Sequence, residues 1–280
     1  MSPFIFLCVL GAALLNASWT AIVKSGEDKA LDVVLVSAGA GLVSAVTLPF
    51  LLQPAAESWP YLAASTVSQW LYYYLLSTAY RHGDMSEAYP LMRGVAPLIV
   101  ATVAGPLIGE TLTAHRWLGV ALISAGALTM ALDGNFRRSS NTSAVPYALA
   151  NAGVIAFYTL VDGVGARKSG APLAYTMWLF LLSAAPMLLW ALLRRRSDFT
   201  RYARGRLHLG GLGGAATVGS YGVVLYSMTL APVALIAALR ETSILFAAAI
   251  AVLILGERIS MLRYLAIGFI AAGAVAIRLA

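Results

Sequence analysis

The sequence is poor in charge. Only 11% of its 280 residues are Asp, Glu, Lys or Arg, and 60% are hydrophobic, whereas a soluble domain has about 25% charged residues. This shortage argues against a water-soluble globule and indicates an all-α integral membrane protein with almost no extramembrane domain. The formal net charge of +7 does not indicate nucleic acid, because no basic segment alternates with aromatic residues. We assign that excess to membrane orientation and anionic lipid headgroups.

Cysteine and histidine are also scarce. Cys8 is the one cysteine, so no intrachain disulfide can form, and the three histidines (His82, His115 and His208) are too scattered for a zinc site. The sequence has no G-x-x-x-x-G-K-[ST] loop, nucleophile elbow, H-E-x-x-H motif or paired carboxylates. We therefore expect no metal, no cofactor and no enzyme activity.

Long apolar runs dominate the chain. A membrane-spanning helix needs about 20 apolar residues, and ten runs approach this length. They cover residues 3–23, 31–52, 60–80, 86–107, 114–132, 145–165, 173–193, 208–229, 233–255 and 261–279. The first run lacks a basic leader and an A-x-A-like cleavage site, so we expect a retained helix. We expect the hydrophilic stretch 194–206 to be a loop.

The two halves of the chain have matching residues at a constant spacing. Arg93 falls on Arg240 and Glu110 on Glu257, in each case at an offset of 147 residues. We predict five helices in a first repeat (1–135), a linker (136–144) and five helices in a second repeat (145–280). An odd number of helices per repeat turns the second copy upside down. This is the inverted-repeat architecture of secondary transporters, which place their substrate in a central cavity near the midplane.

The presence of a charged arginine inside each of the two matched helices calls for one explanation. Each lies about eight residues into its predicted helix, roughly 12 Å deep at 1.5 Å per residue, and a charge there costs roughly 2.5 kcal/mol or more. One hypothesis is an internal ion pair among Arg93, Arg240 and Glu241 that locks the two halves. The other is a polar site that holds a carboxylate, a phosphate or a zwitterion. A pair that breaks and re-forms would satisfy both.

Polar and aromatic side chains within the other predicted helices complete the candidate site. Spacing of three and four puts Trp70, Tyr73, Ser77 and Tyr80 on one helical face, and mid-span tyrosines need partners for their hydroxyls. Asp162, near the end of its predicted helix, is interpreted as a cap or interface residue rather than an ion site. The predicted substrate-binding residues are Asn16, Trp19, Tyr73, Ser77, Tyr80, Tyr89, Arg93, Asn151, Tyr158, Tyr221, Arg240 and Glu241.

Small residues recur at helical spacing in the last predicted helix of each half. Ala121 and Ala125 are one such pair, and Gly268 and Ala272 are another. Such steps allow helices to approach closely, either inside the bundle or between two copies, so the chain is predicted to be a monomer or a homodimer.

Lys and Arg are distributed unevenly between the two sides. Setting aside Arg93 and Arg240, the loops on one side hold 13 basic residues, and the other side, termini included, holds four. The positive-inside rule then predicts that both termini lie outside.

The closing segments of the two halves carry a family resemblance. GETLTAHRWLGVALISAGALTMAL and GERISMLRYLAIGFIAAGAVAIRL, with AYPLMRGVAPL and ALRETSILFAA before them, resemble the EamA family of the drug/metabolite transporter superfamily. The resemblance covers nearly the whole chain. It implies a secondary transporter of the bacterial cytoplasmic (inner) membrane, often with cytoplasmic termini, in conflict with the count of basic residues. Within the family the chain is most similar to aromatic amino acid exporters. Small multidrug members carry a glutamate in their first helix, where this chain has Asn16 and Trp19.

The prediction that follows is an exporter of amino acids, aromatic ones favoured, or of related amphipathic metabolites or drugs, by alternating access. The alternative is an exchanger of organic phosphates or other small anions. A passive channel or a scaffold is a third class, for which the sequence offers no selectivity motif. The expected partners are a small-molecule substrate and the lipid bilayer.

Overall fold

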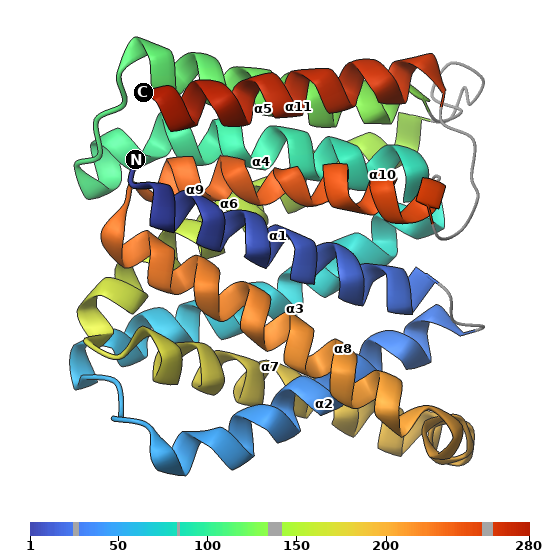
Figure 1. Ribbon diagram of the computed structural model, residues 1–280. Coiled ribbons are helices and arrows are strands. Elements are labelled where there is room, and N and C mark those ends of the chain that lie inside the picture. The colour runs from blue at the N-terminus through green and yellow to red at the C-terminus, as the bar shows by residue number, and fades with distance from the viewer. Residues whose placement is uncertain (25–27, 83–84, 134–141, 254–259) are drawn as a thin grey trace.

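The computed structural model describes residues 1–24, 28–82, 85–133, 142–253 and 260–280, and within these ranges every long element is a helix. The helices are α1 (Pro3–Lys24), α2 (Lys29–Thr47), α3 (Trp59–His82), α4 (Met85–Ile108), α5 (Ala114–Asp133), α6 (Val145–Ser169), α7 (Pro172–Arg194), α8 (Arg196–Leu230), α9 (Val233–Leu239), α10 (Ser243–Leu253) and α11 (Met261–Leu279). They form one bundle, in which α4, α5 and α11 run nearly parallel while α8 crosses the direction of α2 and α3 (Figure 1). Short 3₁₀ turns include η1 (Leu48–Phe50), η2 (Ala56–Ser58), η4 (Thr142–Ala144) and η5 (Arg240–Thr242).

Helical structure lies in each of the ten predicted ranges, and among the described residues eight helical segments are long and apolar enough to cross a membrane. The other two, α3 and α8, are more polar: α3 carries serines, threonines and tyrosines, and α8 begins with a basic segment. The chain is therefore a multi-pass membrane protein. That it has ten spans in two inverted repeats remains a prediction.

The stretch predicted as a loop at 194–206 is helical, which corrects that prediction. Helix α7 ends at Arg194 and α8 begins at Arg196, and a kink with φ −133° and ψ 16° at Arg206 separates the basic first part of α8 from its apolar part. Ion pairs hold the start of α8, since Arg195 contacts Asp28 at 2.9 Å and Asp198 at 3.5 Å. The predicted boundary failed because this segment is charged but contains no helix-breaking proline.

The predicted helix 233–255 is broken near its middle. Helix α9 stops after seven residues, η5 follows with Arg240, Glu241 and Thr242, and α10 continues from Ser243. A 3₁₀ turn inside a helix is tighter and has poorer hydrogen-bond geometry, and it often marks a hinge or a functional site. The break therefore falls on the arginine that the sequence singled out.

Small residues bring α5 and α11 into backbone contact, but they are not the predicted ones. A Cβ atom added at Gly126 would lie 2.7 Å from the Ala266 carbonyl oxygen, and one added at Gly273 would lie 2.7 Å from that of Gly119. The predicted small residues, Ala121 and Ala125 on α5 and Gly268 and Ala272 on α11, lie on exposed faces instead. The two helices do pack within the bundle, through the opposite sides from those predicted.

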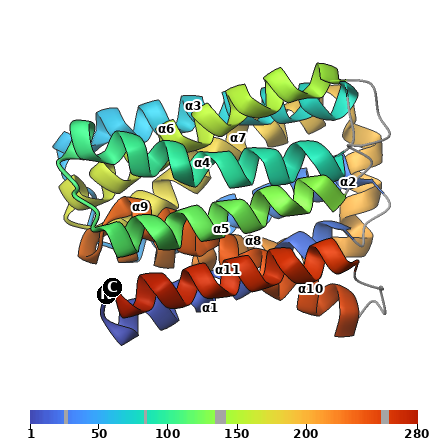
Figure 2. The same cartoon turned by 90° about the horizontal axis from the view of Figure 1, so that it is seen from above.

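Helix α6 lies at the centre, between α3 and α4 on one side and α8 and α9 on the other, and it is the most enclosed of the candidate spans. Helices α5 and α11 lie side by side along one edge of the bundle in Figure 1, and in Figure 2, seen from above, α5 lies between α4 and α11. The two termini lie together at one end, where Arg278 donates to the Met1 carbonyl oxygen at 3.3 Å (Figure 1). Helix α6 packs against α4 and α9, and η5 continues α9. Helices α4 and α6 and the turn η5 therefore lie in one region of the bundle.

Candidate functional site

A buried ion pair joins the two halves of the chain. Arg93 Nε on α4 donates to Glu241 Oε2 in η5 at 2.8 Å, and the two side chains are only 12% and 6% exposed. An isolated charge at this depth would be strongly unfavourable, so each group stabilises the charged form of the other. Glu241 pairs with Arg93 and directly follows Arg240 in the chain. The two matched arginines therefore lie in the same region.

Arg240 has a different environment. Its guanidinium carbon lies 4.9 Å from the centre of the Tyr221 ring, in a cation–π contact. Among the described residues it makes no side-chain hydrogen bond and no ion pair, and the residue is half-buried. Of the ion pair predicted among the three charged groups, the structure shows the contact between Arg93 and Glu241; Arg240 interacts electrostatically with Glu241 but makes no ion pair with it.

Aromatic rings surround these charges. Arg93 lies 5.9 Å from the centre of the Tyr89 ring. Tyr158 on α6 is buried and meets the edge of Tyr72 at 6.3 Å, and Tyr72 in turn packs against Tyr73 at 5.2 Å. Of the predicted aromatic residues, Tyr73, Tyr89, Tyr158 and Tyr221 therefore belong to one neighbourhood. Tyr72 belongs there too, and the sequence analysis missed it.

Asp162 has an environment that the sequence did not predict. It is fully buried on α6, and both carboxylate oxygens accept hydrogen bonds: Oδ1 from the Tyr175 hydroxyl at 3.0 Å and Oδ2 from the Tyr221 hydroxyl at 2.6 Å. The interpretation as a helix cap is wrong, because α6 continues to Ser169 and leaves Asp162 almost two turns inside the helix. No sequence pattern links Asp162 to Tyr175 and Tyr221, which come from α7 and α8.

Two predicted residues on α1 bind each other. Trp19 Nε1 donates to the Asn16 side-chain oxygen at 3.1 Å, and α1 packs against η5. The predicted pair is thus on a helix that contacts the charged turn, with the Asn16 oxygen already occupied.

Of the remaining predicted residues, Asn151 and Tyr80 lie near the charged residues or their tyrosines, and Ser77 does not. Asn151 is fully buried on α6 and donates to the Met92 sulfur at 3.2 Å, next to Arg93. Tyr80 lies close enough to Tyr89 for the two phenols to interact electrostatically. Ser77 faces away: it is exposed, and its hydroxyl donates to the Tyr74 carbonyl oxygen of its own helix. The structure therefore does not place Ser77 with the charged residues, because α3 turns Tyr72 inward instead.

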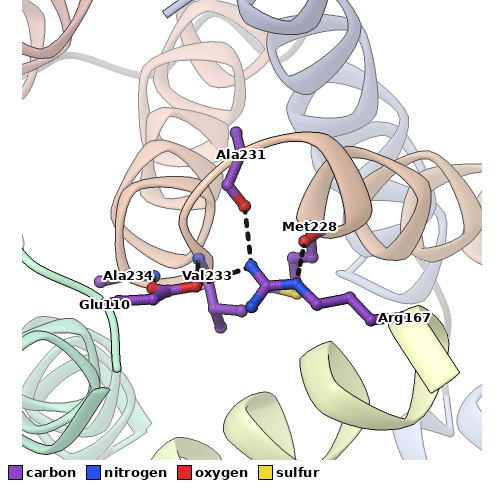
Figure 3. Close-up of polar contacts among 6 residues, drawn as sticks. All are labelled: Glu110, Arg167, Met228, Ala231, Val233 and Ala234. Carbon is purple, nitrogen blue, oxygen red and sulfur yellow. Dashed lines mark hydrogen bonds and ion pairs between the residues drawn. The ribbon is translucent and has the colours of Figure 1, made fainter. Parts of the chain in front are cut away.

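A second polar cluster lies at the end of α4 and involves the first Gly-Glu pair (Figure 3). Glu110 accepts from Arg167 at 2.7 Å and from the backbone N–H groups of Val233 and Ala234 at 2.9 and 3.4 Å. Arg167 also donates to the carbonyl oxygens of Met228 and Ala231, at 2.8 and 3.1 Å. Glu110 thus anchors the first turn of α9 to the ends of α4 and α6.

The backbone conformation at the end of α4 explains why this pair begins with a glycine. Gly109 has φ +71°, a left-handed conformation that closes the end of α4, with the Gly109 and Glu110 N–H groups donating to the Gly105 and Ala104 carbonyl oxygens. The second pair, Gly256 and Glu257, lies outside the described residues.

No group of three or more His, Cys, Asp or Glu side chains in the described part of the chain could hold a metal ion.

Comparisons with known proteins agree with this arrangement of helices. The sequence pattern of the EamA-like transporter family matches twice, over residues 3–132 and 142–279. A Sinorhizobium sp. protein described as "Uncharacterized transporter in cobO 3'region" is 36% identical over 126 residues, which cover 44% of this chain and 82% of that protein.

A solved structure described only as "Crystal structure of protein" superposes on the whole chain with a TM-score of 0.76, at 20% sequence identity and over 99% of its own length. At that identity the likeness concerns the fold alone. Taken together with the twofold match over nearly all residues, these findings show that the chain is a membrane transporter and belongs to the EamA-like transporter family.

Proposed function

We propose that this transporter exports amino acids, aromatic ones favoured, or related amphipathic metabolites across a bacterial inner membrane. The observation that carries the proposal is Arg240, a half-buried guanidinium with no carboxylate partner among the described residues and with Tyr221 against its face. A guanidinium has a rigid fork of donors that matches a carboxylate. Arg240 binds the carboxylate of the substrate, and Tyr158, Tyr72 and Tyr73 accommodate its apolar body.

The same charges favour a carboxylate over a phosphate ester. A doubly charged phosphate needs two free cations, and Arg93 is committed to Glu241 at 2.8 Å. One guanidinium without an ion-pair partner among the described residues matches one carboxylate. We therefore rank the exchange of organic phosphates or other small anions second.

The proposed mechanism is alternating access by rocking of the two five-helix halves. The Arg93–Glu241 pair crosses between them, and η5 supplies a non-α-helical turn next to Arg240. Substrate binding at Arg240 changes the charge beside Glu241, and this change is transmitted to the pair. Bending at η5 then accompanies the exchange of access.

The test is Arg240→Ala in the purified protein. Hydrogen bonds to a charged group are worth about 1.5–3 kcal/mol, so we expect phenylalanine or tyrosine to bind ten- to hundredfold more weakly, measured as the ligand-induced rise in melting temperature. Counterflow of labelled phenylalanine in liposomes should fall in parallel. Arg195→Ala, which removes a surface arginine paired with Asp28, is the matched control and should leave both unchanged. Full phenylalanine counterflow by the Arg240→Ala protein would refute the assignment, and counterflow of phosphate esters alone would replace it with the second candidate.

A further inference from the structure

Tyr221 connects the buried cation and the buried anion that lack charged partners. Its ring lies against the guanidinium of Arg240 at 4.9 Å, and its hydroxyl donates to Asp162 Oδ2 at 2.6 Å. Because the two contacts share one phenol, the guanidinium carbon and the carboxylate oxygen are at most about 10 Å apart. The positive charge thus lies over the ring of this side chain and the negative charge at its hydroxyl.

The hydrogen-bond partners of Asp162 are neutral, and Arg240 acts on its carboxylate only at longer range. Tyr175 comes from α7 and Tyr221 from α8, and α9 packs Val233 against Gly163, the next residue of α6. No Lys, Arg or His side chain within the described ranges forms an ion pair with this carboxylate. Removing a carboxylate from water costs several kcal/mol unless a cation or strong donors replace the water. Two phenol hydroxyls supply donors but no charge.

The four buried charges around η5 balance. Arg93 and Glu241 neutralise each other through their ion pair, and Arg240 and Asp162 are left as one positive and one negative group on either side of Tyr221. A ligand with one carboxylate and no cation would leave this region with a net negative charge in a medium of low dielectric constant, which is costly. A zwitterion adds no net charge.

The geometry has the length of an α-amino acid group. Such a ligand carries its carboxylate and ammonium about 3 Å apart, and one contact at each end extends this to about 9 Å. The Arg240-to-Asp162 separation cannot exceed about 10 Å, so both charges lie within reach of one such ligand, which spans less than about 9 Å when its two contacts are not in line. Phe180, which packs against the Tyr221 ring at 6.0 Å, adds an apolar side chain to this region.

We propose that Asp162 binds the ammonium group of a zwitterionic substrate and that Tyr221 occupies this place in the absence of substrate. The inference rests on the proposed function and deepens it, since it names both ends of the ligand. On binding, the ligand's carboxylate takes the guanidinium of Arg240, its ammonium replaces the Tyr221 hydroxyl on Oδ2, and the phenol swings aside. Tyr175 keeps its hydrogen bond to Oδ1, so Asp162 retains one fixed donor throughout.

The test compares three ligands with the same apolar body: phenylalanine, 3-phenylpropionate, which lacks the ammonium, and phenethylamine, which lacks the carboxylate. Their dissociation constants are measured on the purified full-length protein. We expect the unmodified protein to prefer phenylalanine over 3-phenylpropionate by about ten- to hundredfold, the size of a hydrogen bond to a charged group. In Asp162→Asn, an isosteric change, this preference should disappear, while Arg240→Ala should abolish the preference of phenylalanine over phenethylamine.

A second pair of variants tests the role of Tyr221 without touching the charges. Tyr221→Phe keeps the ring but removes the hydrogen bond to Asp162, so phenylalanine should bind severalfold more tightly because the resting contact is weaker. Tyr175→Phe removes the other hydroxyl and leaves Tyr221 in place, so it should not improve binding. These two variants retain the informative comparison if Asp162→Asn does not fold.

The outcomes separate the two proposals. If phenylalanine fails to bind the unmodified protein, the proposed function is wrong. If phenylalanine binds through Arg240 but Asp162→Asn keeps the full preference over 3-phenylpropionate, the proposed function stands and this inference is overturned. Tighter binding in Tyr175→Phe but not in Tyr221→Phe would equally overturn it.

Discussion

Two of the arginine–carboxylate pairs that connect the halves of this protein are built differently. In the central pair, Arg93 and Glu241 meet through one contact of 2.8 Å amid aromatic side chains. In the pair at the end of α4, Glu110 and Arg167 meet at 2.7 Å, and Arg167 also donates to backbone carbonyls before Pro232 while Glu110 accepts from backbone N–H groups after it. The second pair thus has several additional partners where the first has one contact.

This difference indicates that the two ion pairs have different roles. Each extra backbone contact of Glu110 and Arg167 fixes the start of α9, so movement there would break several hydrogen bonds at once. Separation of Arg93 from Glu241 breaks a single side-chain contact, and Arg240 stands beside it as an alternative cation for the same carboxylate. The pair at the end of α4 is suited to hold the fold, and the central pair is suited to exchange partners.

The largest expected effect is the loss of one member of the central pair. Glu241→Gln leaves Arg93 buried without a counter-charge, which should lower the free energy of unfolding by about 3–5 kcal/mol. Replacing both residues by methionine removes both charges together and should restore most of that loss. Thermal unfolding of the detergent-purified protein measures both. A double variant as unstable as Glu241→Gln would contradict the view that Arg93 needs its partner.

A smaller effect should follow at the other pair. Glu110→Gln keeps an acceptor oxygen for the N–H groups of α9 but loses the charge that holds Arg167, so we expect a loss of about 1–2 kcal/mol in unfolding free energy. Substrate affinity should be unchanged in this variant. The comparison of the two clusters would fail if Glu110→Gln altered the dissociation constant of phenylalanine while leaving the melting temperature intact.

The smallest effect concerns Asp28, the N-cap of α2 outside the membrane-spanning segments. Burial acts to raise the pKa of its carboxyl, but hydrogen bonds from the Leu31 N–H and from Arg195 outweigh this and lower the pKa below its ordinary value of 3.8. The unfolded chain therefore takes up this proton first, so the stabilisation is complete above pH 3.8 and is lost as the pH falls through the lower folded value.

Asp28→Asn tests this sign. Asp28 and Arg195 are each about a third exposed, and such a pair contributes less than about 1 kcal/mol. The variant should be slightly less stable than the unmodified protein at pH 7, and the gap should close towards pH 2.5. A gap that stays constant over this range would show that the carboxyl charge does not contribute.

Much of the fold was predictable because membrane insertion imposes a length. The apolar runs located every long helix, and the offset between Arg93 and Arg240 pointed to the neighbourhood in which Arg93 meets Glu241. The break at η5 was not predictable, since AALRETSILF has neither proline nor glycine to mark it. Only the tertiary contacts of Glu241 explain a tight turn there.

The angular position of side chains was the weakest part of the sequence analysis. In a soluble helix, polar residues mark the outer face, but in a membrane both the lipid and the protein interior are apolar. For this reason spacing alone put Ser77 in the site and left Tyr72 out, and Asp162 could not be connected with tyrosines on two other helices. Rotation of a helix about its axis depends on its neighbours.

The α5–α11 contact has a consequence for biosynthesis. Gly119 and Gly126 on α5 press against the backbone of α11, so this face of α5 lacks its partner until α6 to α10 have been translated. Contacts between such distant parts of a chain form late. The packing of α5 is therefore completed only after α11 has been made.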